Sequence, residues 1–308
     1  MIKITTNKKK ENWIEDIEKS NKTDKIENLP ITDLEDKELV EFVTGKPVQE
    51  GIRKDSDGKF VMDFTVDKID DLLDLTKEEI YKSNFNGHIY RFGYTFKPDI
   101  TSQNRSSVIK WIKGLSEEKP KKSDLRRFVN KPLATFNREI SLTRIDAVIY
   151  PDSKRSDLVQ QMVEISGNYL QHDIGSVGYK LIKNLPQNVE FDWVKFNQDI
   201  SKDEDLNRHN QMKVTATQTM DKIKTKDYFS LAESVKSKYR PYIKNYLTFE
   251  TEEAKKTFSE LQGKKILIID DINTTGATLN EILRVVGKVN DTCEIYIFTL
   301  IGKEWREV

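Results

Sequence analysis

The sequence has a single cysteine, Cys293, and three histidines among its 308 residues. One cysteine excludes an internal disulfide and a cysteine-built zinc site, so we expect a reducing, cytoplasmic setting. The histidines, at positions 88, 172 and 209, are too scattered to suggest a metal motif. The Asn-, Lys- and Ile-rich composition is typical of AT-rich genomes, many phages among them. In a phage protein, the cytoplasm would be that of the host.

Long apolar runs are also missing. No stretch approaches the roughly 18 apolar residues that a membrane helix needs, so we expect no membrane association. Residues 1–10 contain no apolar core of the kind found in secretory signals, so none is predicted. The chain has no excess of either charge, with 51 Lys+Arg against 51 Asp+Glu. This balance excludes a protein that binds polyanions by its overall charge, although a local basic patch remains compatible with it.

Charge is unevenly distributed along the chain. Residues 33–79 hold 15 acidic and 7 basic residues, a net charge of −8, whereas residues 97–155 hold 7 acidic and 14 basic residues, a net charge of +7. Both segments read most simply as solvated faces. The alternative for the basic segment is a surface that faces an anionic ligand or a nucleic acid strand.

The length suggests two domains or one large one, and the local patterns change near residue 135. We predict a polar arm over residues 1–30, an α+β accessory domain of unknown role over residues 31–135, and a third part over residues 136–308. Within the accessory domain, residues 88–96 alternate aromatic and other residues, which predicts a strand with one aromatic face. Packing against a core is the commoner use of such a face, and a stacking platform for nucleic acid bases is the alternative.

Residues 136–308 follow the pattern of a parallel α/β sheet. Short apolar runs at residues 146–150, 265–269 and 293–301 read as buried strands, and amphipathic helical patterns follow the first two. Strand, turn, helix and strand in this order define a βαβ unit whose sheet is covered on both faces. We therefore predict an α/β fold with a parallel-sheet core in the C-terminal part.

The most informative stretch is Ile266–Thr278, ILIIDDINTTGAT. A buried strand ends in two carboxylates, Asp270 and Asp271, and ligands of open parallel sheets bind at the carboxyl ends of strands. A small, hydroxyl-rich turn then leads into a helix, whose N-terminus suits a phosphate. Gly276 lets the backbone approach a ligand closely. Carboxylates beside anion-binding amides fit a sugar phosphate, whose hydroxyls and phosphate would be bound separately.

This stretch resembles the motif that binds 5-phosphoribosyl 1-pyrophosphate (PRPP) in type I phosphoribosyltransferases. The resemblance implies that Asp270 and Asp271 bind the ribose hydroxyls and serve catalysis. It also implies that the next turn binds the 5′-phosphate through backbone amides and hydroxyls. Asn273 departs from the aliphatic residue usual in the family, which we expect to affect loop packing more than phosphate binding. The implied phosphate-binding residues are Thr274, Thr275, Gly276, Ala277 and Thr278.

A second family element should follow the first core strand as a short pyrophosphate-binding loop. The loop after residues 146–150 fits that position, and its basic residues could offset pyrophosphate charge. An ordinary polar loop is the alternative interpretation. The order of elements, with a long excursion before the PRPP strand, resembles the ComF-type subgroup. The pyrophosphate-binding candidates are Asp152, Ser153, Lys154 and Arg155.

Residues 196–264 form a long polar excursion, where the family carries a flexible loop that closes over PRPP. Arg208 and Lys213 are candidates to reach the pyrophosphate, and so are Lys236, Lys238 and Arg240, although a solvated surface role is the simpler interpretation for each. The chain offers little sequence after residue 301 for a C-terminal hood. Residues 1–135 are therefore the expected lid or partner surface.

The resemblance implies a glycosyltransferase reaction of nucleotide metabolism, in which 5-phosphoribosyl passes from PRPP to a nitrogen acceptor and pyrophosphate leaves. Mg²⁺ would bridge the pyrophosphate and ribose oxygens, and Asp270 and Asp271 would act on the ion indirectly. The acceptor, a nucleobase or a related compound, is not defined by the sequence. Two alternatives stay open: a ComF-like protein in DNA uptake or processing, and a non-catalytic PRPP or nucleotide sensor or assembly component. A homodimer is a further open option.

Overall fold

The computed structural model describes residues 51–63, 73–75, 81–96, 100–140, 145–153, 156–169, 178–202 and 206–302. The predicted polar arm over residues 1–30 lies outside these ranges. By its internal contacts the chain divides after Pro47, and every described residue belongs to the second unit, Val48–Val308. No helix among the described residues is long and apolar enough to span a membrane.

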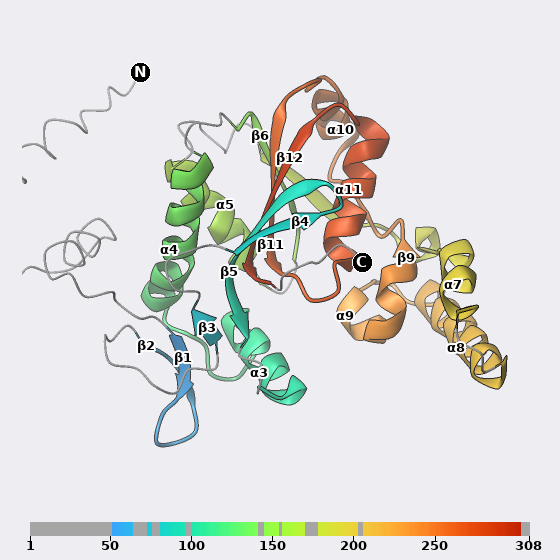
Figure 1. Ribbon diagram of the computed structural model, residues 1–308, viewed down its shortest axis with the longest axis horizontal. Coiled ribbons are helices and arrows are strands. Elements are labelled where there is room, and N and C mark those ends of the chain that lie inside the picture. The colour runs from blue at the N-terminus through green and yellow to red at the C-terminus, as the bar shows by residue number, and fades with distance from the viewer. Residues whose placement is uncertain are drawn as a thin grey trace, which may run out of the picture. The chain divides into compact units, whose positions relative to one another are not determined.

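The centre of the described unit is an eight-stranded sheet (Figure 1). Its strand order is β10-β7-β6-β11-β12-β5-β3. Strand β3 pairs with the C-terminal end of β5, and β4 pairs with the N-terminal part of β5. Five neighbouring strands run parallel and three peripheral strands run antiparallel to them. This confirms the predicted α/β fold class. The parallel strands are β5 (His88–Phe96), β6 (Ala147–Pro151), β7 (Gly178–Lys183), β11 (Lys265–Ile272) and β12 (Glu294–Ile301), and the antiparallel ones are β3 (Leu73–Leu75), β4 (Tyr81–Phe85) and β10 (Leu247–Phe249).

The remaining strands and the helices surround this sheet. Two small antiparallel sheets pair β1 with β2 and β8 with β9. Figure 1 shows α4 and α5 on one side of the sheet and α11, α9, α7 and α8 on the other. The buried residues of α3 join the same core cluster as those of α4 and α5. The strands are β1 (Gly51–Lys54), β2 (Phe60–Asp63), β8 (Glu190–Phe191) and β9 (Ile243–Lys244), and the helices are α3 (Ser102–Ile112), α4 (Lys122–Ile140), α5 (Leu158–Tyr169), α7 (Trp193–Ile200), α8 (Leu206–Lys224), α9 (Leu231–Ser234), α10 (Glu252–Ser259) and α11 (Ala277–Val289), with 3₁₀ turns η2 (Pro186–Asn188) and η3 (Ser237–Tyr242).

Strand β11 explains why the core has two halves. Successive side chains of a strand point to opposite faces of the sheet. Ile266 and Ile268 join the cluster that contains the apolar stripe of α11, while Leu267 and Ile269 join the cluster built on α3, α4 and α5. All four are fully buried. The uninterrupted apolar run in the sequence is therefore the signature of a strand covered on both faces.

The sheet is continuous across the boundary predicted near residue 135. Strand β5 pairs in parallel with β12, so a strand from the predicted accessory domain extends the sheet of the C-terminal part. Helix α4 runs through residue 135 and packs against α5 and β5. Residues 88–96 and 100–136 thus share one core with the residues that follow them.

The aromatic strand predicted at residues 88–96 is β5, and its rings are in the core. Tyr90, Phe92 and Tyr94 are at most 4% exposed, which leaves them no surface for stacking on bases. Tyr90 and Phe92 join one core cluster, and Tyr94 joins the other. Tyr94 stacks on Phe128 of α4 with ring centroids 4.1 Å apart.

Tyr94 also satisfies a backbone group that α4 leaves open. The Phe128 carbonyl would accept from the N–H of residue 132 in a regular helix, but residue 132 is proline and has no N–H. The Tyr94 hydroxyl donates to this carbonyl at 2.6 Å. Burial raises the pKa of Tyr94, so the hydroxyl keeps its proton and acts as the donor. The contact joins α4 to the sheet at the strand that borders β12.

Candidate active site at the carboxyl ends of β6 and β11

Between the neighbouring strands β6 and β11, the connections of the chain change direction along the sheet. From β6 the chain passes through α5 to β7 on one side, and from β11 it passes through α11 to β12 on the other. In open parallel sheets the loops that leave such strands diverge and form a ligand-binding crevice at their carboxyl ends. Residues 152–153 and the turn after residue 272 therefore lie at the same edge of the sheet, although more than 100 residues separate them in the sequence.

Asp270 and Asp271 end the buried part of β11, and each is 5% exposed. The Asp271 backbone N–H donates to Asp270 Oδ1 at 2.9 Å, so a local bond fixes the Asp270 carboxyl. Lys113, which caps the C-terminus of α3, places its Nζ 2.7 Å from Asp271 Oδ2. A buried carboxylate needs such a partner, because the interior solvates charge poorly.

The electrostatics of the acid pair are dominated by burial. Burial, together with the neighbouring Asp271 carboxylate, raises the pKa of Asp270 to about 7. Burial disfavours the charge of Lys113 as well, but the Asp271 carboxylate more than compensates, so the pKa of Lys113 lies above its ordinary value. Lys183, the last residue of β7, lies close enough to Asp270 to be stabilised by it, yet burial lowers its pKa. Lys113 from the end of α3 and Lys183 from the end of β7 thus lie near the two aspartates at the carboxyl end of β11.

The turn after the acid pair is fixed by Asn273, which is 5% exposed. Its Oδ1 accepts from the Gly276 N–H at 2.9 Å, and its Nδ2 donates to the Tyr90 hydroxyl at 3.2 Å. Tyr90 in turn lies 2.9 Å from the Thr299 hydroxyl. The Asn273 N–H donates to the Ile301 carbonyl at 2.8 Å. The Asn273 side chain, which departs from the aliphatic residue of the family motif, therefore links the turn to β5, and the Asn273 backbone links it to β12.

Replacing Asn273 by leucine, the kind of residue usual in the family motif, should loosen this turn. The Asn273→Leu variant loses both side-chain hydrogen bonds and leaves buried polar groups with fewer partners. We expect its free energy of unfolding to fall by about 2–3 kcal/mol, at roughly 1 kcal/mol or more for each buried bond. Chemical denaturation measures the loss, and the exposed neighbour Thr274→Val serves as the control. A Leu variant as stable as the wild type would contradict this role of Asn273.

The five predicted phosphate-binding residues lie at the start of α11. Thr274 is exposed and Thr275 half-buried, so the hydroxyl-rich part of the turn is accessible. Gly276 has φ 72°, a left-handed conformation that favours glycine, and it caps the helix without a side-chain cap bond. Ala277 begins α11, and Thr278 follows it in the first turn. The structure thus joins the acid pair, through a turn whose Thr274 is exposed, to a helix N-terminus, as the sequence predicted.

Behind this turn, Glu281 ties α11 to the start of β10. Its side chain is 1% exposed and accepts from the N–H groups of Tyr246 and Leu247 at 2.8 and 3.2 Å. Arg284, one turn later on α11, binds both carboxylate oxygens at 2.7 Å. Tyr246 lies next to the site, because Lys183 Nζ is 5.4 Å from the centre of its ring. Glu281 therefore holds one wall of the site through backbone contacts.

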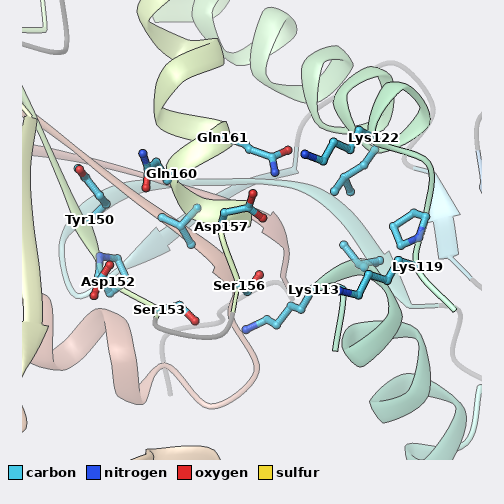
Figure 2. Close-up of a pocket in the computed structure, with 16 residues that line it drawn as sticks. Lys113, Lys119, Lys122, Tyr150, Asp152, Ser153, Ser156, Asp157, Gln160 and Gln161 are labelled. Carbon is cyan, nitrogen blue, oxygen red and sulfur yellow. The ribbon is translucent and has the colours of Figure 1, made fainter. Parts of the chain in front are cut away.

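A cavity of about 380 Å³ opens beside the loop after β6 (Figure 2). Asp152 and Ser153, two of the four predicted pyrophosphate-binding residues, line it. The other two, Lys154 and Arg155, lie outside the described residues. The opposite wall comes from the end of α3, the loop after it and α4, which contribute Lys113, Lys119 and Lys122. Part of the basic segment noted in the sequence therefore faces this cavity.

Arg208 and Lys213 lie on α8, so the flexible loop predicted here is wrong for residues 206–224. His209, Ala216, Met220 and Ile223 form the buried face of this helix, which packs into the core cluster of α7 and η3. Arg208 and Lys213 are both exposed. Their predicted contact with pyrophosphate stays a prediction. The excursion as a whole is built of helices α7 to α10 and short strands rather than of one loop.

Lys113 and Lys183 are the site residues that the sequence did not indicate. Lys183 had a usable signal, because it ends a strand that neighbours β6, and strand ends of parallel sheets form the ligand edge. Lys113 had none. It lies 158 positions from Asp271 in the sequence (271 − 113), and only the packing of α3 against the sheet brings them together.

Residues 206–307 match the family model of the phosphoribosyl transferase domain. The match spans α8 to β12, and it includes both aspartates and the turn into α11. It covers about one third of the chain and excludes β5, β6 and α3. A search of curated proteins finds no match. The fold and this match together support a phosphoribosyltransferase-like protein of the type I class, with the matched domain in the C-terminal part.

Proposed function

We propose that the chain binds PRPP and transfers its 5-phosphoribosyl group to a nitrogen acceptor, with release of pyrophosphate. The observation that carries the proposal is the position of the acid pair. Asp270 and Asp271 lie at the end of β11, where the connections of the chain change direction along the sheet. The turn that follows them leads into the N-terminus of α11. A sugar phosphate matches this pairing of carboxylates and helix amides.

Each part of the site then has a role toward PRPP. Asp270 and Asp271 accept hydrogen bonds from the ribose hydroxyls and orient the ring. The turn over residues 274–278 binds the 5′-phosphate through N–H groups and hydroxyls. The loop over residues 152–155 receives the pyrophosphate, whose charge the lysines of the adjoining cavity offset.

The cofactor in this proposal is Mg²⁺, carried in with the substrate. No three His, Cys, Asp or Glu side chains among the described residues are grouped closely enough to hold a metal ion by themselves. One or two carboxylates together with substrate phosphates are the usual surroundings of Mg²⁺ in such sites, so the acid pair fits this mode of binding. Bound there, the ion would neutralise charge on the leaving pyrophosphate.

The reaction breaks the bond between ribose C1 and the pyrophosphate oxygen, which leaves with both bonding electrons. The acceptor nitrogen donates its lone pair to C1, and its proton passes to the departing pyrophosphate when the new bond forms. Positive charge develops on the ribose ring in between, and the nearby carboxylates stabilise it. The protein's contribution is to align the acceptor with C1 and to exclude water.

Turnover is tested by pyrophosphate release from PRPP and Mg²⁺ with a panel of nucleobases and related nitrogen acceptors. We expect release with at least one acceptor and none from an Asp270→Asn/Asp271→Asn variant. PRPP binding without turnover on any acceptor would contradict the transferase function and favour the alternative of a non-catalytic PRPP sensor. A protein that binds no PRPP would lack the proposed function altogether.

A ComF-like role in DNA uptake or processing is the second candidate, and the basic segment over residues 97–155 is the feature that favours it. Titration with DNA at increasing salt concentration tests this role, because phosphate contacts weaken steeply with salt. We expect no salt-dependent DNA binding, since three of the segment's lysines line the cavity. Tight, salt-sensitive binding would favour the DNA role.

A further inference from the structure

Lys113 reaches the acid pair from outside the segment that matches the phosphoribosyl transferase domain. Helix α3 ends at this residue, and the Lys113 N–H bonds to the Ile109 carbonyl. Gly114 follows with φ 67° and donates to the Trp111 carbonyl at 2.9 Å, which closes the helix end. Trp111 and Ile112 are buried in the core. The backbone of Lys113 is therefore fixed at the rim of the site, while its long side chain can reorient.

The Lys113 ammonium has two polar environments within reach. On one side it pairs with Asp271 at 2.7 Å, where the side chains are 24% and 7% exposed. On the other side it lines the cavity, together with Ser153 and Ser156 of the loop after β6. Figure 2 shows the Lys113 side chain extended toward these two serines. The amine therefore stands between the predicted ribose site and the predicted pyrophosphate site.

We propose that Lys113 is a substrate-binding residue that neutralises Asp271 before PRPP binds and turns to the pyrophosphate of PRPP when the ribose hydroxyls take its place. This inference rests on the proposed function and assigns a role to a residue outside the matched domain. A ribose hydroxyl that donates to Asp271 Oδ2 competes with the ammonium for the same oxygen. The displaced ammonium then finds a multiply charged partner in the adjoining cavity, where a charge-assisted bond is stronger than one to a neutral group.

The test compares two fragments of the substrate. We would use calorimetry to measure the dissociation constant of ribose 5-phosphate, and that of Mg-pyrophosphate with saturating ribose 5-phosphate present so that its hydroxyls occupy Asp271. Both are measured for the wild type and for Lys113→Met. The charge of Lys113 serves only pyrophosphate in the occupied site. We therefore expect pyrophosphate to bind at least about tenfold more weakly to the variant, the size of one charge-assisted contact. Ribose 5-phosphate should bind equally well or more tightly, because Asp271 no longer has to release a lysine.

Lys110→Met is the matched control, since Lys110 is exposed on the same helix one turn earlier. It should bind both ligands like the wild type. Lys113→Gln is the second variant, for the case that methionine beside Asp271 prevents folding. Its amide can still donate to the carboxylate but carries no charge, so pyrophosphate affinity should fall as in the Met variant.

Three outcomes would overturn the inference. Unchanged pyrophosphate affinity in both folded Lys113 variants would show that the amine does not turn to the cavity. Equal loss of both ligands would show that Lys113 only maintains the shape of the site. Wild-type protein that binds neither ligand would remove the proposed function as well, which separates that failure from the first two.

Discussion

Removal of the Glu281 side chain should lower the free energy of unfolding more than any other single change considered for this protein. The Glu281→Ala variant leaves the Arg284 guanidinium and two backbone N–H groups without their carboxylate. Breaking a buried ion pair by removing one partner costs about 3–5 kcal/mol. We expect a loss of this size, because the Glu281 side chain is almost fully buried.

Chemical denaturation of Glu281→Ala measures this loss. Lys288→Ala is the control, since Lys288 is exposed on the same helix and should change the free energy of unfolding by no more than about 0.5 kcal/mol. Because Glu281 positions Tyr246 beside the site, the Ala variant should also bind PRPP less tightly at temperatures where it is folded. A loss below about 1 kcal/mol would show that the contacts of Glu281 do not hold α11 and β10 together.

Neutralising either aspartate should abolish PRPP binding, with opposite effects on stability. An asparagine keeps the size of the side chain but offers one acceptor oxygen instead of two and no charge. We expect Asp270→Asn and Asp271→Asn each to bind PRPP at least about a hundredfold more weakly, which corresponds to roughly 2.7 kcal/mol or more. Titration calorimetry with Mg-PRPP measures the effect.

The stability of the two variants separates a binding role from a structural one. Burial raises the pKa of Asp270 to about 7, so its charge costs the folded state stability progressively as pH rises from the ordinary Asp range to about 7. Asp270→Asn should therefore be as stable as the wild type or more stable at pH 8. Asp271→Asn should be less stable, because it leaves the partly buried Lys113 ammonium without its carboxylate partner. A destabilised Asp270→Asn protein would assign Asp270 a structural role.

The sequence predicted the parts of the fold that depend on local patterns. Strands β5, β6, β11 and β12 and helices α5 and α11 lie where periodicity placed them, because burial imposes the pattern on contiguous residues. Helix α8 also carried such a signal. Its buried residues His209, Ala216, Met220 and Ile223 are spaced by seven, four and three positions, the period of a helix. The family resemblance predicted a flexible loop at these residues, whereas the helical spacing indicated the helix that the structure shows.

The contacts that complete the site could not be predicted in this way. The pairing of β5 with β12 and the ion pair of Lys113 with Asp271 join residues more than 150 positions apart. Such contacts follow from how the sheet is assembled, which no local pattern encodes. The acid pair and the turn after it were predictable because one strand–turn–helix unit carries all of their residues.

The central claim is that the acid pair and the turn over residues 274–278 form a PRPP site. Isothermal titration of Mg-PRPP into the full chain tests it most directly, because binding requires no acceptor. We predict saturable binding to one site per chain, competed by ribose 5-phosphate and lost in Asp270→Asn and Asp271→Asn. Absence of PRPP binding to the folded wild type, or binding that both variants retain, would contradict the claim.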